Sequence, residues 1–365
     1  MSGSTTKNLP AGKKRLFAPR KNLADWMGAL GTESIGVDLG TSRVVIYSRR
    51  KGIILPEASM VAMREKDGTM LAFGNRAEAM EGRTPKGIIT IRPLQESAIV
   101  EYNPAAYLLQ SVLRRTALRE VFFHPRLIMC VPPDINGVQR RALLEAAVAM
   151  GTKKAVLVEQ PLAAAMGAGL DTERMVGAMI VDVGGGSVKI SILSRHGIVV
   201  SDWLKEGGLS MDQAVMTYVQ DKYRVCIGRK AAEEAKIALG ITGATSKVLH
   251  AAEVAGSSVV TALPMKLEVT GDDVRDALQP IMDQICRRVL AVLQRTPPAL
   301  LADIRDHGIL LTGGASQLRG FDDLISKVTG MPAFVAENPS YINAIGAGSA
   351  LEYMDLFRDS LQDLH

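Results

Sequence analysis

The chain has 365 residues, of which 47% are hydrophobic and 22% are charged, and its formal net charge is +5. This composition is typical of an ordinary soluble protein with enough apolar residues for two domains. Much of the basic excess lies at the N-terminus, and no other stretch interleaves basic with aromatic residues, so no nucleic-acid surface is expected. No apolar run approaches about 18 residues, so no membrane-spanning helix is expected either.

The cysteines lie far apart in the sequence and lack the spacing of a metal site. Each has apolar or mixed neighbours, a pattern typical of reduced core residues in a cytosolic protein. The three are Cys130, Cys226 and Cys286.

Residues 1–33 form a separate N-terminal extension in which a basic cluster precedes a short amphipathic helix. Leu23, Trp26, Met27 and Leu30 fall on one face of that helix. An apolar face beside basic residues suits an anchor that lies in the membrane interface. A helix docked on the protein body, or a free tail, is the alternative. The segment lacks the apolar core and cleavage site of a signal peptide, so export is not expected.

The first half opens with an apolar strand, an aspartate and a glycine turn, Ile35 to Arg43, and residues 44–48 follow as the return strand. A strand at 57–63 and a turn-rich stretch then suggest a small inserted subdomain. A helix begins at Asn103. The triplet Val121-Phe122-Phe123 precedes Pro125 and is either a buried staple or a second membrane-touching tip.

Buried strands at 126–131 and 155–158 alternate with helices, the second of which begins at Pro161. Alternation of this kind builds a parallel sheet that binds ligands at the carboxyl ends of its strands. Gln160 follows the second of these strands directly, so it is expected near the ligand.

The second half repeats the opening pattern, because Met179 to Ser187 is again an apolar strand, an aspartate and a glycine turn. Helices are expected at 211–223, 231–239 and 272–294, with strands and polar turns at 244–270. A strand at 309–312 then runs into small residues that leave room for a flat ring against the backbone.

The repeated hairpin suggests two related half-molecules that share one cleft. Glycine amides can approach phosphate closely, and an aspartate at the strand end can hold a hydrated Mg²⁺ ion. A nucleoside triphosphate between two such hairpins is the economical interpretation. Two unrelated tight hairpins are the alternative.

Five motifs in a fixed order carry a family resemblance. The order resembles the superfamily of actin, sugar kinases and DnaK-type chaperones, and within it the match is closest to the MreB family of bacterial actin-like, shape-determining proteins. The motifs are Asp-Leu-Gly-Thr (38–41), Val-Glu-Gln-Pro (158–161), Asp-Val-Gly-Gly-Gly-Ser (182–187), Glu-Glu-Ala-Lys (233–236) and Leu-Thr-Gly-Gly-Ala-Ser (311–316).

The resemblance covers about residues 34–360 and implies the α/β fold class. The implied fold is actin-like, with two related ribonuclease H-like domains and inserted small subdomains around a nucleotide cleft. The implied boundaries are 34–174 for the first half with an insertion at about 62–103, 175–343 for the second half with an insertion at about 211–268, and 344–365 for a C-terminal helix that returns to the first half.

The resemblance also implies ATP and Mg²⁺ as cofactors, with Asp38 beside the metal and backbone amides of both hairpins on the phosphates. Glu233 and Lys236 are implied at the ribose, the 313–317 turn at the adenosine, and Gln160 with Ser187 at the attacking water. The complete implied cofactor set is Asp38, Gly40, Thr41, Ser42, Arg43, Asp182, Gly184, Gly185, Gly186, Ser187, Glu233, Lys236, Gly313, Gly314, Ala315, Ser316 and Gln317.

At the phosphate end of this site, the chain differs from the residues that are common in the family. Arg43 and Lys189 stand where the family commonly has asparagine and glutamate, and Gln160 replaces a glutamate. Ala315 replaces a glycine of the adenosine turn. Two positive charges are thereby added and a potential general base is lost, so a slow ATPase coupled to filament assembly is expected.

The function implied by the resemblance is an ATP-binding cytoskeletal protein that polymerises with itself into filaments and organises cell-wall synthesis and cell shape. The family implies a cytoplasmic, peripheral position on the inner face of the cytoplasmic membrane. It also implies membrane proteins of the cell-wall elongation machinery as partners. The alternatives are a soluble small-metabolite kinase of the same superfamily and a non-polymerising ATP-binding adaptor.

Overall fold

A computed structural model shows how the two halves are built. The residues it describes are 34–95, 98–116, 126–149, 152, 154–170, 177–195, 197–241, 250–350 and 362–363. The N-terminal extension 1–33, the triplet Val121-Phe122-Phe123 and most of the chain after residue 350 lie outside the described residues.

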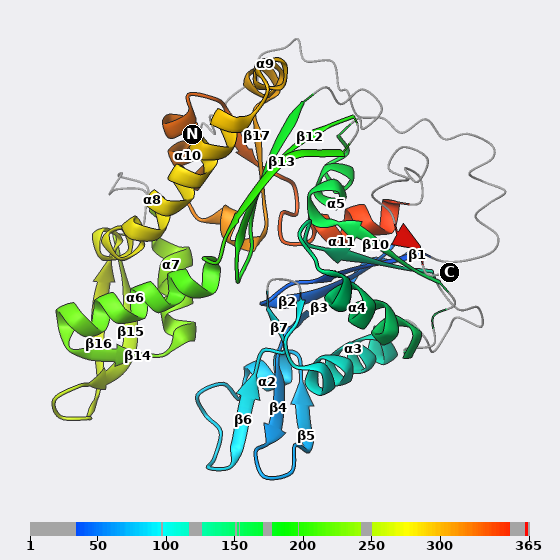
Figure 1. Cartoon of the computed structure of the whole chain (residues 1–365). Helices are drawn as coiled ribbons and strands as arrows, with labels where there is room; N and C mark the ends of the chain where they lie inside the picture. Colours follow the sequence, from blue (N-terminus) through cyan, green and yellow to red (C-terminus); the bar gives the residue numbers. More distant parts are fainter. Residues whose placement is uncertain are drawn as a thin grey trace, which may run out of the picture.

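The first half is built on a mixed sheet whose strand order is β19-β10-β9-β1-β2-β3. β1, β9 and β10 run parallel, and β2 and β3 continue the sheet as antiparallel strands from the glycine turn after β1 (Figure 1). The strands are β1 Ser34–Leu39, β2 Arg43–Ser48, β3 Gly52–Ala58, β9 Arg126–Val131, β10 Lys154–Glu159 and β19 Gln362–Asp363.

Apolar residues cover both faces of this sheet, because helices pack on each side. On one face Ile35, Val37 and Leu39 pack with the helices α3, Tyr102–Thr116, and α4, Gly137–Ala149. On the other face lie α5, Gln160–Gly167, and α11, Ile342–Ser349.

The second half has the sheet order β13-β12-β11-β17-β18, in which the glycine hairpin of β11 and β12 matches that of β1 and β2. The expectation of two related halves is therefore confirmed. Its strands and helices are β11 Ala178–Val183, β12 Val188–Ser194, β13 Gly197–Leu204, β17 Ile309–Thr312, β18 Ala333–Val335, α8 Gly271–Arg295, α9 Pro298–His307, the 3-10 turn η1 Gly314–Gln317 and α10 Phe321–Thr329.

α5 and α11 lie between the two sheets and belong to one core that contains residues of both halves. The two helices touch through their backbones. A Cβ atom added at Gly346 would collide with the carbonyl oxygen of Ala163, and one at Gly167 would collide with that of Ile342. Only glycine permits this approach, so the pair forms a tight joint between the halves.

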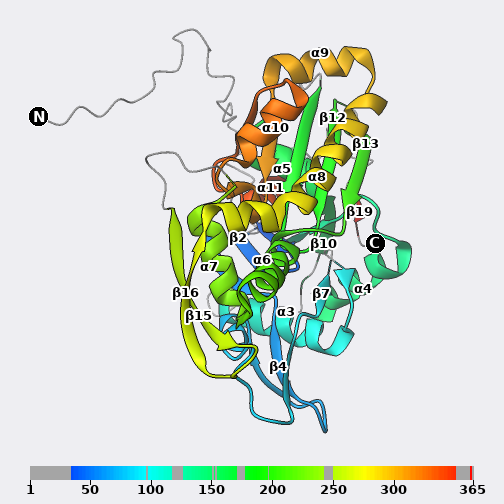
Figure 2. The ribbon, with the colours of Figure 1, turned by 90° about the vertical axis from the view of Figure 1, so that its left-hand side faces the viewer.

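Each half carries a small subdomain, and both subdomains lie at the same end of the molecule in the two views (Figures 1 and 2). The first has a sheet of order β5-β4-β6 and the second a sheet of order β14-β15-β16. Their elements are β4 Val61–Arg64, β5 Met70–Phe73, α2 Asn75–Glu78, β6 Ile88–Ile91, β7 Leu94–Gln95, β8 Ala98–Ile99, α6 Gly208–Tyr223, β14 Val225–Ile227, α7 Arg229–Leu239, β15 Ala251–Ser258 and β16 Pro264–Thr270.

The structure differs from the sequence-based expectations in two places. Cys226 is exposed, although it was expected in the core, because β14 is an edge strand and its middle residue points outward. Residues 362–363 form the short strand β19 beside β10, where a helix was expected. The other two cysteines are buried and free.

Among the described residues, no helix is long and apolar enough to cross a bilayer.

Candidate functional site

A cavity of about 380 Å³ lies between the two halves, with both glycine hairpins on its wall. This volume falls in the range of small-molecule sites. Of the site residues expected from the sequence, Ser316 alone is not part of the lining, because its buried hydroxyl donates to the carbonyl of Gly313. The structure therefore brings the two hairpins, Gln160, the α7 residues and the turn after β17 to one place.

The two hairpins meet at their tips. A Cβ atom at Gly185 would collide with Ser42, and one at Gly186 would lie 2.9 Å from Cβ of Thr41. The turn itself is closed by the Gly184 amide, which donates to the carbonyl of Ser187 at 2.9 Å. Glycine is thus required here by the neighbouring half as well as by the turn, and the two backbones can surround a phosphate chain from both sides.

Two aspartates face each other at the ends of the hairpin strands. The side-chain amide of Asn343 donates to Asp182 at 3.1 Å and to Asp38 at 3.5 Å, so α11 joins them. Burial, together with the nearby Asp182, raises the pKa of Asp38 to about 6, although donors from Gln160 and Asn343 oppose the shift. Two neighbouring carboxylates, one buried and one half-buried, favour a cation beside them.

The aspartate pair fits a nucleotide-bound Mg²⁺ ion. Across the described part of the chain, no group of three or more His, Cys, Asp or Glu side chains could hold a metal ion. Mg²⁺ in nucleotide sites usually takes one or two carboxylates and completes its shell with phosphate oxygens and water. Asp38 and Asp182 could supply those carboxylates, and the buried Oδ1 of Asn343, which has no hydrogen-bond partner among the described atoms, is a further acceptor beside them.

Gln160 is the first residue of α5 and is only 3% exposed. Its amide nitrogen donates to Asp38 at 3.0 Å, and its carbonyl oxygen accepts from the Lys189 ammonium at 2.5 Å. Lys189 belongs to β12 of the second half, so this chain of hydrogen bonds crosses the cavity. The glutamine carbonyl, which could orient a water molecule, is already engaged by the lysine.

The α7 residues line the cavity, but their charged ends have protein partners. The Lys236 ammonium is buried and donates to Asp212 at 2.6 Å and to the carbonyl of Gly208 at 3.0 Å. Burial raises the pKa of Asp212, and Lys236 opposes that shift. Glu233 pairs with Arg229 at 3.3 Å. Lys236 therefore fixes the cavity wall between α6 and α7.

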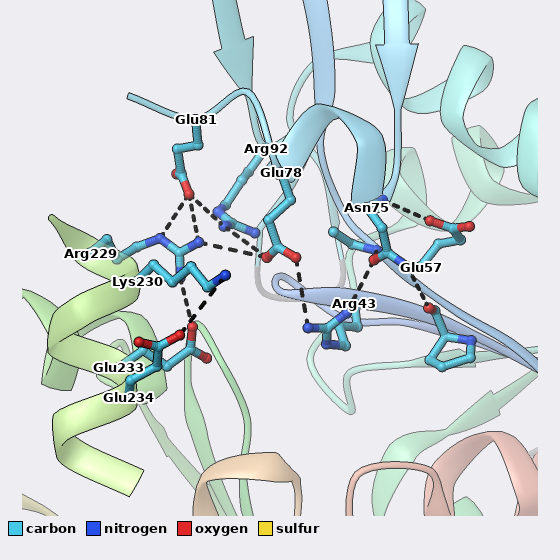
Figure 3. Close-up of polar contacts among 12 residues, drawn as sticks. Arg43, Glu57, Asn75, Glu78, Glu81, Arg92, Arg229, Lys230, Glu233 and Glu234 are labelled. Atoms are coloured by element: carbon cyan, nitrogen blue, oxygen red, sulfur yellow. Dashed lines mark hydrogen bonds and ion pairs between the residues drawn. The ribbon is translucent and has the colours of Figure 1, made fainter. Parts of the chain in front are cut away.

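Arg43 is the exposed member of the first hairpin and points toward the first small subdomain. Its guanidinium donates to Asn75 at 3.3 Å and lies 3.8 Å from Glu78 (Figure 3). Arg43 is also among the residues that line the cavity.

Sequence reasoning missed Asn343 and Asp212, which both line the cavity. Their partners lie up to 305 residues away, so no local spacing connects them. One signal was present at Asn343. It is a buried polar residue near the start of α11, a helix made otherwise of apolar and small residues.

The architecture is that of the actin-like class, in which two related halves with small subdomains enclose a ligand cavity. A family model described as MreB/Mbl protein matches residues 32–359. The chain belongs to the MreB/Mbl family.

Relatives match along nearly their whole length. The cell shape-determining protein Mbl of Bacillus cereus is 38% identical over 323 residues, which are 88% of this chain and 96% of that protein. The cell shape-determining protein MreB of Escherichia coli K12 is 34% identical over 330 residues, 89% of this chain and 95% of that protein.

Solved structures agree with the fold. MreB5 of Spiroplasma citri bound to ADP superposes with a TM-score of 0.84 at 27% identity, covering 88% of this chain and 97% of that one. The same protein bound to AMPPNP gives a TM-score of 0.83 at 27% identity, with coverage of 89% and 97%. The MamK double helical filament gives 0.74 at 20% identity, with coverage of 88% and 99%, and supports the fold alone.

Proposed function

We propose that this protein binds Mg-ATP between its halves and polymerises into filaments that organise cell-wall synthesis and cell shape. The observation that carries the proposal is the pair of glycine hairpins, one from each half, that meet across one cavity with an aspartate at the end of each leading strand. The ADP and AMPPNP bound to MreB5 support a nucleotide as the ligand. The names of the Mbl and MreB relatives support the cellular role.

In this proposal each part of the cavity has its own task. Backbone amides of residues 40–43 and 184–187 bind the phosphates, and Asp38 with Asp182 holds Mg²⁺, which would neutralise phosphate charge. Glu233 lies at the ribose end, where Lys236 holds the wall in place. The turn at 313–317 offers backbone and the small side chain of Ala315 to the adenine ring, because Gly313 and Gly314 carry no side chain and all three residues line the cavity.

Hydrolysis in this site is slow, because Gln160 can orient a water but cannot take its proton. Its carbonyl accepts a hydrogen bond from Lys189. A triphosphate attracts the lysine ammonium, and the carbonyl then becomes available to an attacking water. Ser187 is buried at the end of the glycine turn 184–187 and is the second contact for that water or the phosphate.

Filament formation is tested by electron microscopy of the purified protein with Mg-ATP. Filaments are expected with Mg-ATP and their absence is expected with EDTA, since the nucleotide sets the relative position of the halves. Particles that remain monomeric in both conditions would favour the non-polymerising adaptor. The metabolite kinase has less support, because the relatives of 34% and 38% identity are named for cell shape.

We further propose that the filament lies on the inner face of the cytoplasmic membrane and there meets membrane proteins of the cell-wall elongation machinery. Two apolar segments support this, residues 16–30 and Val121 to Phe123. Burying one such side chain contributes about 1.5–3 kcal/mol, so each segment alone binds weakly. A filament presents many copies, and their combined avidity gives stable attachment.

Liposome co-sedimentation with anionic lipids is expected to fall for Trp26→Glu and for Phe122→Ser, and to fall further when both are combined. Each change removes an apolar side chain from one of the two apolar segments. Trp26→Glu also adds a negative charge, which the anionic lipid repels. Trp203→Glu is the matched control, since Trp203 lies on β13 outside both segments. Full pelleting of the double variant would contradict this attachment.

A further inference from the structure

A cluster of ion pairs joins the two small subdomains beside the cavity, whose lining includes one member of the cluster, Glu233. It consists of Glu78, Glu81 and Arg92 from the first half and Arg229 and Glu233 from the second (Figure 3). We call it the cross-cleft cluster.

Arg229, the first residue of α7, makes the direct contact. Its Nε and Nη2 both donate to Oε2 of Glu81, at 2.9 and 2.6 Å, and Nη2 lies 3.6 Å from Glu78. The side chains of Arg229 and Glu81 are 21% and 31% exposed, so water screens the pair only in part. Charge-assisted hydrogen bonds in such a setting are stronger than those between freely exposed groups.

Neighbouring charges hold both ends of this contact. On the second half, Glu233 and Asp212 lie 3.3 and 3.7 Å from the other guanidinium nitrogen of Arg229. On the first half, Arg92 lies 3.9 Å from Glu78 and 3.7 Å from Glu81, and is 14% exposed. Each partner is therefore positioned on its own subdomain before the two meet.

The position of the cluster gives it a specific consequence for the cavity. The halves are joined tightly at α5 and α11, whereas the small subdomains lie away from that joint, at one end of the molecule (Figure 1). Opening that end must separate Arg229 from Glu81. Glu233, which pairs with Arg229, also lines the cavity.

We propose that the cross-cleft cluster is an ionic latch that closes the nucleotide cavity and sets the rate of nucleotide release; this rests on the proposed nucleotide-binding function. Ion pairs of this kind are weak enough to open reversibly and are sensitive to salt. The latch slows escape of the nucleotide without touching it. Raising the ionic strength therefore speeds release from the wild-type protein.

The test is a stopped-flow chase of a fluorescent ATP analogue from wild type, Arg229→Ala, Glu81→Ala and the double variant. Each single variant is expected to release the analogue about three- to tenfold faster. The double variant is expected to be no faster than the faster single variant, because both changes remove the same contact. Lys266→Ala is the control, since its ion pair with Glu253 lies wholly within the second small subdomain.

Release rates that are unchanged in all variants, or effects that add in the double variant, would overturn the latch. Release from wild type is also expected to accelerate between low and high salt, and this difference should disappear in Arg229→Ala. A salt effect of equal size in that variant would likewise count against the proposal. The salt comparison on wild type needs no substitution, so it does not depend on how a variant folds.

A distance measurement separates this proposal from the nucleotide-binding proposal. Cys226 is exposed in the second small subdomain, while Cys130 and Cys286 are buried, and a Lys66→Cys change adds an exposed label site in the first. Spin labels at these positions are expected to move apart in nucleotide-free protein when Arg229→Ala is added. Failure of wild type to bind Mg-ATP would overturn the nucleotide function, and an unchanged label distance would overturn the latch.

Discussion

Phosphate release from filaments of the Gln160→Ala variant is expected to fall about 10- to 100-fold below that of wild type, because the group that orients the attacking water is lost. Gln160 is held at the end of β10 by Asp38 and Lys189, so its carbonyl is already positioned within the cavity. Alanine leaves this place empty. The measurement is phosphate release at saturating Mg-ATP, above and below the polymerisation concentration.

The Gln160→Glu variant is expected to release phosphate faster than wild type, since a carboxylate can accept the proton of the water as well as orient it. The new carboxylate would lie beside Asp38, where Lys189 in the nucleotide-free protein and Mg²⁺ in the loaded protein would offset the added charge. Gln213→Ala is the control, because Gln213 lies exposed on α6 and bonds to Thr217 within its own helix. Equal rates in wild type and both Gln160 variants would show that this residue does not position the water.

Replacing Asp38 by asparagine is expected to weaken Mg-ATP binding by about 10- to 100-fold while it stabilises the nucleotide-free protein. The affinity falls because one of the two carboxylates beside the cation is lost. Titration calorimetry with Mg-ATP measures this effect, and an unchanged affinity would remove Asp38 from the metal site.

The stabilising effect follows from the pKa of Asp38, which burial and Asp182 raise from 3.8 to about 6. The unfolded chain loses this proton first, so the free energy of unfolding falls as the pH rises from about 4 to about 7. The full cost is up to roughly 3 kcal/mol, since each pKa unit corresponds to about 1.4 kcal/mol. An asparagine side chain at this position does not titrate. The free energy of unfolding of the variant therefore increases relative to that of wild type between about pH 4 and about pH 7.

Urea unfolding in EDTA, at a series of pH values, measures that gain. Asp67→Asn carries the same change of charge at an exposed position, where hydrogen bonds with Thr69 lower the aspartate pKa to about 2. A lowered carboxylate pKa contributes stability that is present above about pH 4, so this control should not gain as the pH rises. If the difference in unfolding free energy between Asp38→Asn and wild type does not change with pH, the pKa of Asp38 is not raised in the folded protein.

The parts of the site that the sequence predicts are those encoded within a few residues. The aspartate and glycines of each hairpin follow directly after an apolar strand, so their place at the cavity needs no distant information. The turn after β17 is predictable for the same reason. The repeat of the hairpin also predicts the two related halves, because the same local signal implies the same local fold.

The contacts that could not be predicted join residues far apart in the chain. Arg229 and Glu81 are 148 residues apart, and their meeting depends on how the two small subdomains approach each other. Lys189 appears in the sequence as an added charge near the phosphates, yet its partner in the structure is the carbonyl of Gln160. Only the packing of the halves decides which of several possible acceptors a flexible ammonium reaches.

The joint of α5 and α11 has a consequence for synthesis of the protein on the ribosome. α11 also packs on β1, where a Cβ atom at Gly36 would collide with the carbonyl oxygen of Ala344. Part of the apolar surface of the first half therefore stays uncovered until residues 342–349 have been synthesised. A chain cut short before residue 343 lacks the asparagine that joins Asp38 to Asp182. Translation products that end before residue 343 therefore cannot assemble the complete cavity.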